Sequence, residues 1–265
     1  MGNRKTIVCA LAVVGLLAAC SSSDDPAEQR PTTTSGGRSP VTDGFDARAA
    51  AYLADATAAP VEPGASRDLV WRAVARLASD PEADADLTVA DLTTITDRIA
   101  TFTDTTDFDM IALLNLWFRS DHGKRLPDET RDHVRGLILG FKYWYDEPQP
   151  AGIVDERWYW SENHQILYHA LEYLAGQEFP DEVFTITGTT GADHLDHARP
   201  LIERWVEQRA RYGFSEWYSN VYYEEDLEAT VALAEFAADD DVATTTASRP
   251  RRAIPAASWR WPATA

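Results

Sequence analysis

The residues best suited to chemistry lie in one stretch, WYWSENHQILYHALEYLAGQEFPD, which covers residues 158–181. Ser161 is a strong helix N-cap, so Asn163 and His164 fall in the first turn, and Tyr168 follows on the same face as His164. An Asn at a helix N-terminus could stabilise a carboxylate or enolate, a His could remove a proton, and a Tyr could return one. This combination suits β-elimination in acidic polysaccharides.

Two alternatives remain open for this stretch. In a purely structural interpretation, Asn163 and His164 tie the helix to the following loops and Tyr168 belongs to the core. In a hydrolytic one, Glu162 or Glu216 joins a second carboxylate for acid/base cleavage of a glycosidic bond. In a chain this acidic, however, a given Glu is more often solvated surface.

Aromatic residues gather around the same stretch and in GFSEWYSNVYYEED, residues 213–226. Several of them fall in expected loops, where core packing explains them less easily. Flat rings with a polar edge suit the faces of sugars. We therefore expect a glycan-binding aromatic cleft in which substrate contacts come from Trp158, Trp160, Trp217, Tyr218, Asn220, Tyr222 and Arg211.

Metal ligation is a weaker signal. His194 and His197 are three residues apart at the start of an expected helix, with Asp193 and Asp196 beside them, so both imidazoles could touch one ion. No third ligand follows at a recognisable spacing. The sequence therefore predicts neither a metal site nor a cofactor.

The N-terminus predicts export. Arg4 and Lys5 precede an apolar run, Ile7–Ala19, that is too short to span a membrane and reads as a signal peptide over residues 1–19. Leu17–Cys20 resembles the lipobox of bacterial lipoproteins, which implies lipidation of Cys20 and anchoring on the extracytoplasmic face of the cell membrane. An ordinary signal peptide followed by a chance Cys is the alternative. Residues 20–42, rich in Ser, Thr and Pro, read as a flexible tether.

Composition narrows the classes of partner. The formal net charge of −19 and the lack of a basic stripe argue against nucleic acid as a partner. Cys9 lies inside the expected signal peptide, so Cys20 would be the only cysteine left, and no disulfide is expected.

Helical periodicity dominates residues 43–240, where we expect a single all-α domain of stacked antiparallel helical hairpins. The helix through Asn163 should be amphipathic and stop at Gly176, and Pro200 should kink or break the next one. Residues 241–265, which become basic and Pro-rich from Arg249, are expected to be a disordered or non-authentic tail replacing further helices. The expected helices cover residues 45–56, 66–77, 88–99, 108–118, 127–141, 161–175, 192–211 and 224–237.

Two segments, 159–184 and 190–233, resemble an uncharacterised bacterial family through the patterns SENHQ, LAGQxFPD and GFSEWxSNVY. They are also similar to α/α-toroid enzymes of polysaccharide metabolism, which include alginate and heparin lyases and six-hairpin glycosidases. That resemblance implies a partial toroid and an Asn163–His164 pair working with a Tyr, which could be Tyr168 or one of Tyr218, Tyr222 and Tyr223. The acidic domain fits a polyuronate substrate poorly.

The sequence as a whole predicts an exported, lipid-anchored, glycan-binding protein with lyase-like chemistry at Asn163, His164 and Tyr168. A glycoside hydrolase is the rival enzyme. A non-catalytic binding lipoprotein or an inactive remnant is the rival from another class.

Overall fold

The computed structural model describes residues 44–253, and this part of the chain is all-α, as predicted. Its only β-type contact is an isolated bridge between Val183 and Thr190. The expected signal peptide, Cys20 and tether lie outside the described residues. The elements are α2 (Phe45–Ala58), α3 (Ser66–Ser79), the 3₁₀ turn η2 (Val89–Leu92), α4 (Thr93–Ala100), α5 (Thr106–Arg119), α6 (Asp128–Leu139), α7 (Glu162–Glu178), α8 (Gly191–Tyr212), α9 (Tyr222–Phe236) and α10 (Asp240–Ala253).

Local signals in the sequence mark three of the starts, those of η2, α6 and α8. Thr88 and Asp91 form a capping box at η2, and Thr190 and Asp193 form one at α8. Pro127 precedes α6 as its N-cap residue. These groups satisfy or avoid backbone N–H donors that the first turn of a helix leaves unpaired.

Three expected boundaries were wrong. Helix α7 continues through Gly176 to Glu178, because Gly176 serves a close helix crossing and not a helix end. Pro200 lies inside α8, which remains one helix of 22 residues. Helix α10 covers part of the expected tail, and its Val242 and Thr246 side chains are buried.

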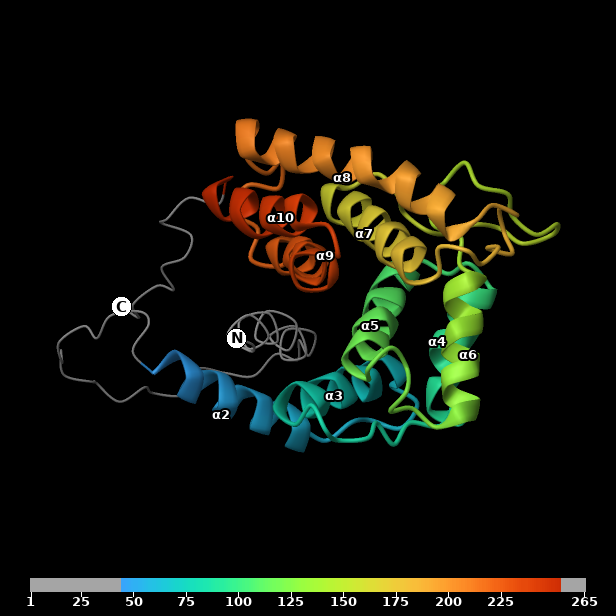
Figure 1. Ribbon diagram of the computed structural model, residues 1–265, viewed down its shortest axis with the longest axis vertical. Coiled ribbons are helices and arrows are strands. Elements are labelled where there is room, and N and C mark those ends of the chain that lie inside the picture. Colours follow the sequence, from blue (N-terminus) through green and yellow to red (C-terminus); the bar gives the residue numbers. More distant parts are fainter. Residues whose placement is uncertain (1–43, 254–265) are drawn as a thin grey trace, which may run out of the picture.

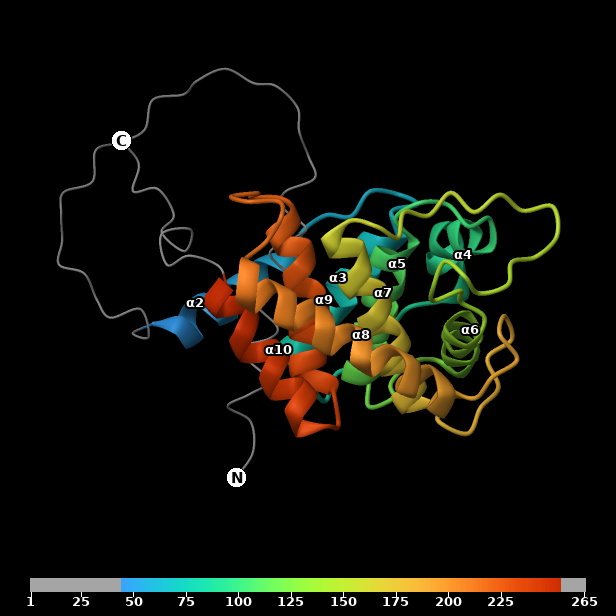
Figure 2. The ribbon, with the colours of Figure 1, turned by 90° about the horizontal axis from the view of Figure 1, so that it is seen from above.

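The helices follow an open arc in Figure 1, from α2 through α3 and α5 to α7 and α8, with α9 and α10 beside α7. Helix α7 packs on α5, α8 and α9, while α10 packs on α8 and α9. Seen from above, α4 and α6 lie at the end of the molecule away from α10 (Figure 2). The toroidal closure of this arc stays a prediction.

Helix α7 is the centre of the packing. Fourteen of its 17 residues are buried, so the helix is enclosed on nearly all sides. The prediction of an amphipathic helix was therefore wrong. Its crossing with α8 is close because Gly176 faces Gly191: a Cβ built on Gly176 would lie 2.4 Å from the Gly191 carbonyl oxygen and 2.8 Å from the Leu195 nitrogen. Only residues without a side chain permit this approach.

A buried carboxylate joins the helices before α7. Asp109 on α5 is fully buried and accepts a hydrogen bond from Arg67 Nε at 2.7 Å and one from Arg98 Nε at 2.8 Å. The two arginines come from α3 and α4, so a single carboxylate fixes three helices. Its charge is compensated in place, as a buried carboxylate requires.

No helix among residues 44–253 combines the length and the apolar character needed to cross a membrane.

We predict that Gly176→Ala destabilises the fold by about 1–3 kcal/mol, because the added Cβ overlaps backbone atoms of α8. Chemical denaturation of the purified full chain measures this. Gly136→Ala is the matched control: Gly136 lies within α6 with nothing near its Cβ position, so the same change should stabilise the protein by about 0.5–1 kcal/mol. Equal effects at the two glycines would contradict the close crossing.

Candidate functional site

The candidate site is the N-terminal end of α7, which we call the α7 N-terminal site and define by Asp107, Asn163, His164 and Glu225. These residues come from α5, α7 and α9, so three helices meet there. Trp205 of α8 fixes the helix start, since its Nε1–H donates to the Glu162 carbonyl oxygen at 2.8 Å.

Glu162, expected as a catalytic acid, is a structural anchor instead. Its carboxylate accepts four hydrogen bonds: from Arg209 Nη1 at 2.7 Å, from Ser215 N and Oγ at 3.0 and 2.8 Å, and from Glu216 N at 2.9 Å. A buried carboxylate with this many donors has little capacity left to accept a proton from substrate or water. Glu162 therefore holds the loop after α8 against the start of α7.

Asn163 is also fully engaged. It is buried, accepts a short hydrogen bond from Ser161 Oγ, and donates through Nδ2 to Glu225 Oε2 of α9. Ser161 occupies the N-cap position as predicted, but its hydroxyl binds the Asn163 side chain and not a backbone N–H. Asn163 consequently positions Glu225 at the helix start.

His164 forms a dyad with Asp107. The Nδ1–H of His164 donates to Asp107 Oδ2 at 2.5 Å, and no hydrogen bond among the described residues involves Nε2. Its side chain is 11% exposed while Asp107 is completely buried. Burial opposes the charged imidazolium, yet the hydrogen bond and charge of Asp107, with Asp104 and Glu225, raise the pKa of His164 above its usual range. The dyad orients Nε2 as a proton acceptor.

Contrary to the prediction, Tyr168 does not belong to the α7 N-terminal site. It lies on the same face of α7 as His164, but that face is buried. The centre of the Tyr168 ring is 4.5 Å from that of Tyr159 and 6.2 Å from that of Phe141. Its hydroxyl is buried and has no partner among the described residues. Burial, with the charge of Asp107, raises the pKa of Tyr168 well above its usual value. A phenol enclosed in this way cannot reach a polysaccharide.

Helix α9 adds carboxyl groups to the same corner. Burial, more than any neighbour, raises the pKa of Glu225 to about 7 and that of Asp226 to about 9. Both Asp226 oxygens lack a partner in the described part of the chain. Glu228 is fully buried, which also raises its pKa well above normal. Glu225 is thus the member of this group that can exchange a proton near neutral pH.

Glu216, the other expected carboxylate, lies in the loop that Glu162 anchors. Burial and the charge of Glu162 raise the pKa of Glu216, and its Oε2 has no partner among residues 44–253. Because the Glu162 carboxylate already accepts four hydrogen bonds, Glu216 is the one of these two candidates that is left to work with a second carboxylate.

Most of the aromatic residues expected at a glycan surface are exposed. The Tyr145 and Trp160 rings pack at a tilt with their centres 4.6 Å apart, and the Trp217 and Tyr218 rings lie edge to face with their centres 5.0 Å apart. The second pair follows directly on the loop that Glu162 anchors. The exposed side chains, each 42 to 56% accessible, are Tyr145, Trp158, Trp160, Trp217, Tyr218 and Tyr222.

Asn220 and Arg211 were also expected to contact a glycan. Asn220 is exposed beside the second aromatic pair. Arg211 is exposed but pairs with Glu207 on its own helix, one turn away, and its guanidinium lies over Tyr212. Arg211 is therefore not a clamp for the α7 N-terminal site.

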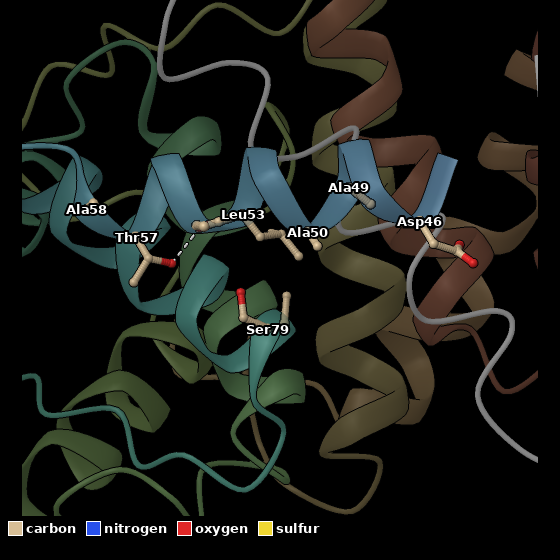
Figure 3. Close-up of a pocket in the computed structure, with 9 residues that line it drawn as sticks. Asp46, Ala49, Ala50, Leu53, Thr57, Ala58 and Ser79 are labelled. Atoms are coloured by element: carbon tan, nitrogen blue, oxygen red, sulfur yellow. Dashed lines mark hydrogen bonds between the residues drawn. The ribbon is translucent and has the colours of Figure 1, made fainter. Parts of the chain in front are cut away.

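The two hollows described in the structure lie elsewhere. One, of about 450 Å³, is an apolar groove between α2 and the end of α3, where Ala50 and Leu53 point toward Ser79 (Figure 3). The other, of about 260 Å³, lies between α8 and α10. Neither is lined by a residue of the α7 N-terminal site or by one of the exposed rings, so neither is the expected aromatic cleft.

A second cluster of titratable residues surrounds the middle of α7. Glu172 accepts hydrogen bonds from Nδ1 of His194 and Nδ1 of His197, both at 2.9 Å, and Glu147 approaches His194 at 3.8 Å. Burial, then the charge of Glu172, raises the pKa of Glu147 to about 7. Asp193, expected near a metal, is occupied in its capping box instead.

Sequence reasoning missed the partners that give both clusters their chemistry. Asp107 and Glu225 lie 57 and 62 residues from their α7 partners, and Glu172 lies 22 residues before His194. The one available signal was the sequence of α7. A helix with His and Glu residues on several of its faces needs polar partners from neighbouring elements if those faces are buried.

No family model, curated protein or solved structure matches this chain significantly. The resemblances drawn from the SENHQ and GFSEW patterns stay predictions.

The buried carboxyls predict that stability falls as pH rises. Asp226 keeps its proton in the folded state up to about pH 9, whereas the unfolded chain releases it near its usual value of 3.8, so folding is progressively disfavoured between these values. Asp226→Asn should remove up to about 1.4 kcal/mol of this loss per pH unit. Denaturation midpoints at about pH 5, 7 and 9 should show the variant gaining on the wild type as pH rises. Asp132→Asn, on the exposed side of α6, is the control, and parallel curves for wild type and Asp226→Asn would refute the assignment.

Proposed function

We propose that this chain binds a glycan over the exposed aromatic residues and cleaves it by general acid–base chemistry at the α7 N-terminal site. The observation that carries the proposal is the Asp107–His164 dyad, whose Nε2 is free at the edge of a buried acid cluster. Ordinary packing does not require a histidine to be oriented with one nitrogen left free. General acid–base catalysis does.

Elimination is the leading reaction. His164 Nε2 removes the proton next to a uronate carboxylate, and the electrons of that C–H bond form a C=C bond as the neighbouring C–O bond breaks. Glu225, held by Asn163 and with a pKa of about 7, gives its proton to the departing sugar oxygen. No other reactant is needed. Tyr168 has no part in this step because it is buried.

Hydrolysis is the second candidate, and the surplus of carboxyl groups favours it. The site holds carboxyl groups of Asp107, Glu216 and Glu225 but, within residues 44–253, no paired cation that would hold a uronate carboxylate, so a neutral sugar is also accommodated. In this version His164 activates a water molecule and Glu225 again protonates the leaving oxygen. The two reactions differ in product: only elimination yields an unsaturated sugar that absorbs ultraviolet light.

We predict that His164→Ala lowers kcat by roughly 10²–10⁴-fold on any glycan that the wild type cleaves, because the proton acceptor is lost. The assay follows reducing ends and ultraviolet absorbance together, over a panel of uronate-containing, neutral and amino-sugar polysaccharides. His133→Ala is the matched control, since His133 contacts Thr96 on the distant α4–α6 pair. Equal losses in the two variants, or no cleavage anywhere on the panel, would sink the catalytic proposal.

The pH profile tests the roles separately. A neutral His164 and a protonated Glu225 are both required, so the acid limb of the activity profile should follow the raised His164 pKa and the alkaline limb the Glu225 pKa of about 7. Asp107 is a positioning residue: Asp107→Asn removes a cause of the raised His164 pKa and should move the acid limb to lower pH. Glu225→Gln should abolish the alkaline limb. An unshifted acid limb in Asp107→Asn would contradict the dyad.

The proposal places this chemistry on a lipid anchor at Cys20, outside the cytoplasm, on the strength of the lipobox-like Leu17–Cys20. We predict that Cys20→Ser leaves the chain unprocessed or releases it from the membrane, because serine lacks the thiol to which the lipid would be attached. Fractionation of expressing cells, with metabolic labelling by a fatty acid, measures this. Ser21→Ala is the control, and equal fatty-acid labelling of Cys20→Ser and wild type would contradict the anchor.

A further inference from the structure

Four side chains of the types that bind metals converge at the middle of α7. Glu172 lies on α7, His194 and His197 on the first turns of α8, and Glu147 on the loop after α6. Glu172 Oε1 is 2.9 Å from Nδ1 of each histidine, and Glu147 Oε1 is 3.8 Å from Nδ1 of His194. One ligand atom each from Glu147, Glu172 and His194 lies within 4.8 Å of the other two.

This spacing is close to that of a metal's ligand shell. Tetrahedral zinc holds N and O ligands at about 2.0–2.2 Å, which places the ligands roughly 3.4 Å from one another. The measured separations of 2.9 and 3.8 Å lie on either side of that value. Small side-chain shifts would therefore let an ion sit among Glu147, Glu172 and His194, whereas His197 lies outside this set of three and would have to turn toward the ion from its contact with Glu172.

We propose that Glu147, Glu172, His194 and His197 bind one divalent transition-metal ion, with zinc as the closest match. Two imidazole nitrogens with carboxylate oxygens suit zinc, whereas magnesium and calcium favour all-oxygen sites. This site goes beyond the proposed glycan chemistry and does not depend on it.

The groups behind the ligands are arranged as in metal sites. Thr187 Oγ1 lies 2.9 Å from Nε2 of His194, so the ring's other nitrogen is held and Nδ1 faces the carboxylates. The backbone N–H of Tyr143 donates to Glu147 Oε2 at 2.7 Å, which leaves Oε1 directed at His194. Such outer contacts orient ligating histidines and carboxylates in known metal sites.

The buried carboxyl groups of Glu147 and Glu172 would also be stabilised by a bound cation. The side chains of Glu147 and Glu172 are 9% and 2% exposed, and His194 and His197 are the basic groups that contact them. A divalent ion neutralises two adjacent carboxylates without requiring either imidazole to be protonated.

His169 supplies an independent observation. It lies one turn before Glu172 on α7, and its ring centre is 4.5 Å from that of Trp144. The ring is 4% exposed, yet its Nδ1 has no hydrogen-bond partner among the described residues. A water molecule bound to the metal would provide the partner that this buried nitrogen lacks.

The location gives the ion a structural consequence. His197 is 48% exposed at the side chain, so the site opens to solvent on one side. The ion would join the loop that carries Tyr145 to α7 and α8, and so fix one part of the exposed aromatic surface.

The test is a metal titration of the full chain, purified without a polyhistidine tag and treated with a chelator. We expect one equivalent of zinc to bind, by calorimetry and by elemental analysis, with a rise in melting temperature. His197→Ala and Glu147→Gln should each weaken zinc binding at least tenfold, because each removes a ligand. With cobalt in place of zinc, the visible absorption should lose intensity or shift in His197→Ala.

His122→Ala is the matched control, since His122 also pairs with a glutamate of α7, Glu178, but is exposed and outside the cluster. This variant should bind zinc as the wild type does. Circular dichroism of each variant ensures that a loss of binding is not a loss of fold. Failure of the folded wild type to bind zinc, or equal affinity in wild type, His197→Ala and Glu147→Gln, overturns the proposal.

Discussion

The burial of α7 is the constraint on which the rest of the structure depends. A helix enclosed on nearly all sides must have its polar side chains paired from other elements, because an unpaired buried polar group costs on the order of 1–3 kcal/mol. The sequence places Glu162, Asn163, His164, His169 and Glu172 on this helix. Helices α5, α8 and α9 pack around α7 with complementary groups, so the same side chains define both the packing and the chemistry.

The two clusters are consequently linked through a rigid element. His164 and Glu172 are eight residues apart, which corresponds to about 12 Å along a helix axis. The loop between α6 and α7 passes both clusters. Glu147 and Trp144 lie beside the middle of α7. Trp158 precedes the start of α7, and its backbone N–H donates a hydrogen bond to Asp104. An ion at one end of this loop would thus bear on the aromatic surface at the other.

Local patterns predicted the all-α class, most helix starts, and the position of Asn163 and His164 at the beginning of α7. They could not predict Asp107 or Glu225, because tertiary packing alone brings together residues 57 and 62 positions apart. The spacing of His164 and Tyr168 correctly gave a shared face, but periodicity does not say whether a face meets solvent or another helix. Helix α10 was missed because its polar composition hides the few buried contacts made by Val242 and Thr246.

Both clusters hold more carboxyl groups than neighbouring cations, and the two resolve this differently. At the start of α7, Asp226 and Glu228 form no ion pair within residues 44–253, so burial keeps them protonated, and Glu225 and His164 are the groups of this cluster that can exchange protons near neutrality. At the middle of α7, His194 and His197 both contact Glu172, and Glu147 approaches His194. Buried acids of this kind lower stability unless a proton or an ion accompanies them. Such a concentration along one helix is a feature that functional sites often share, and it agrees with the chemistry proposed for α7.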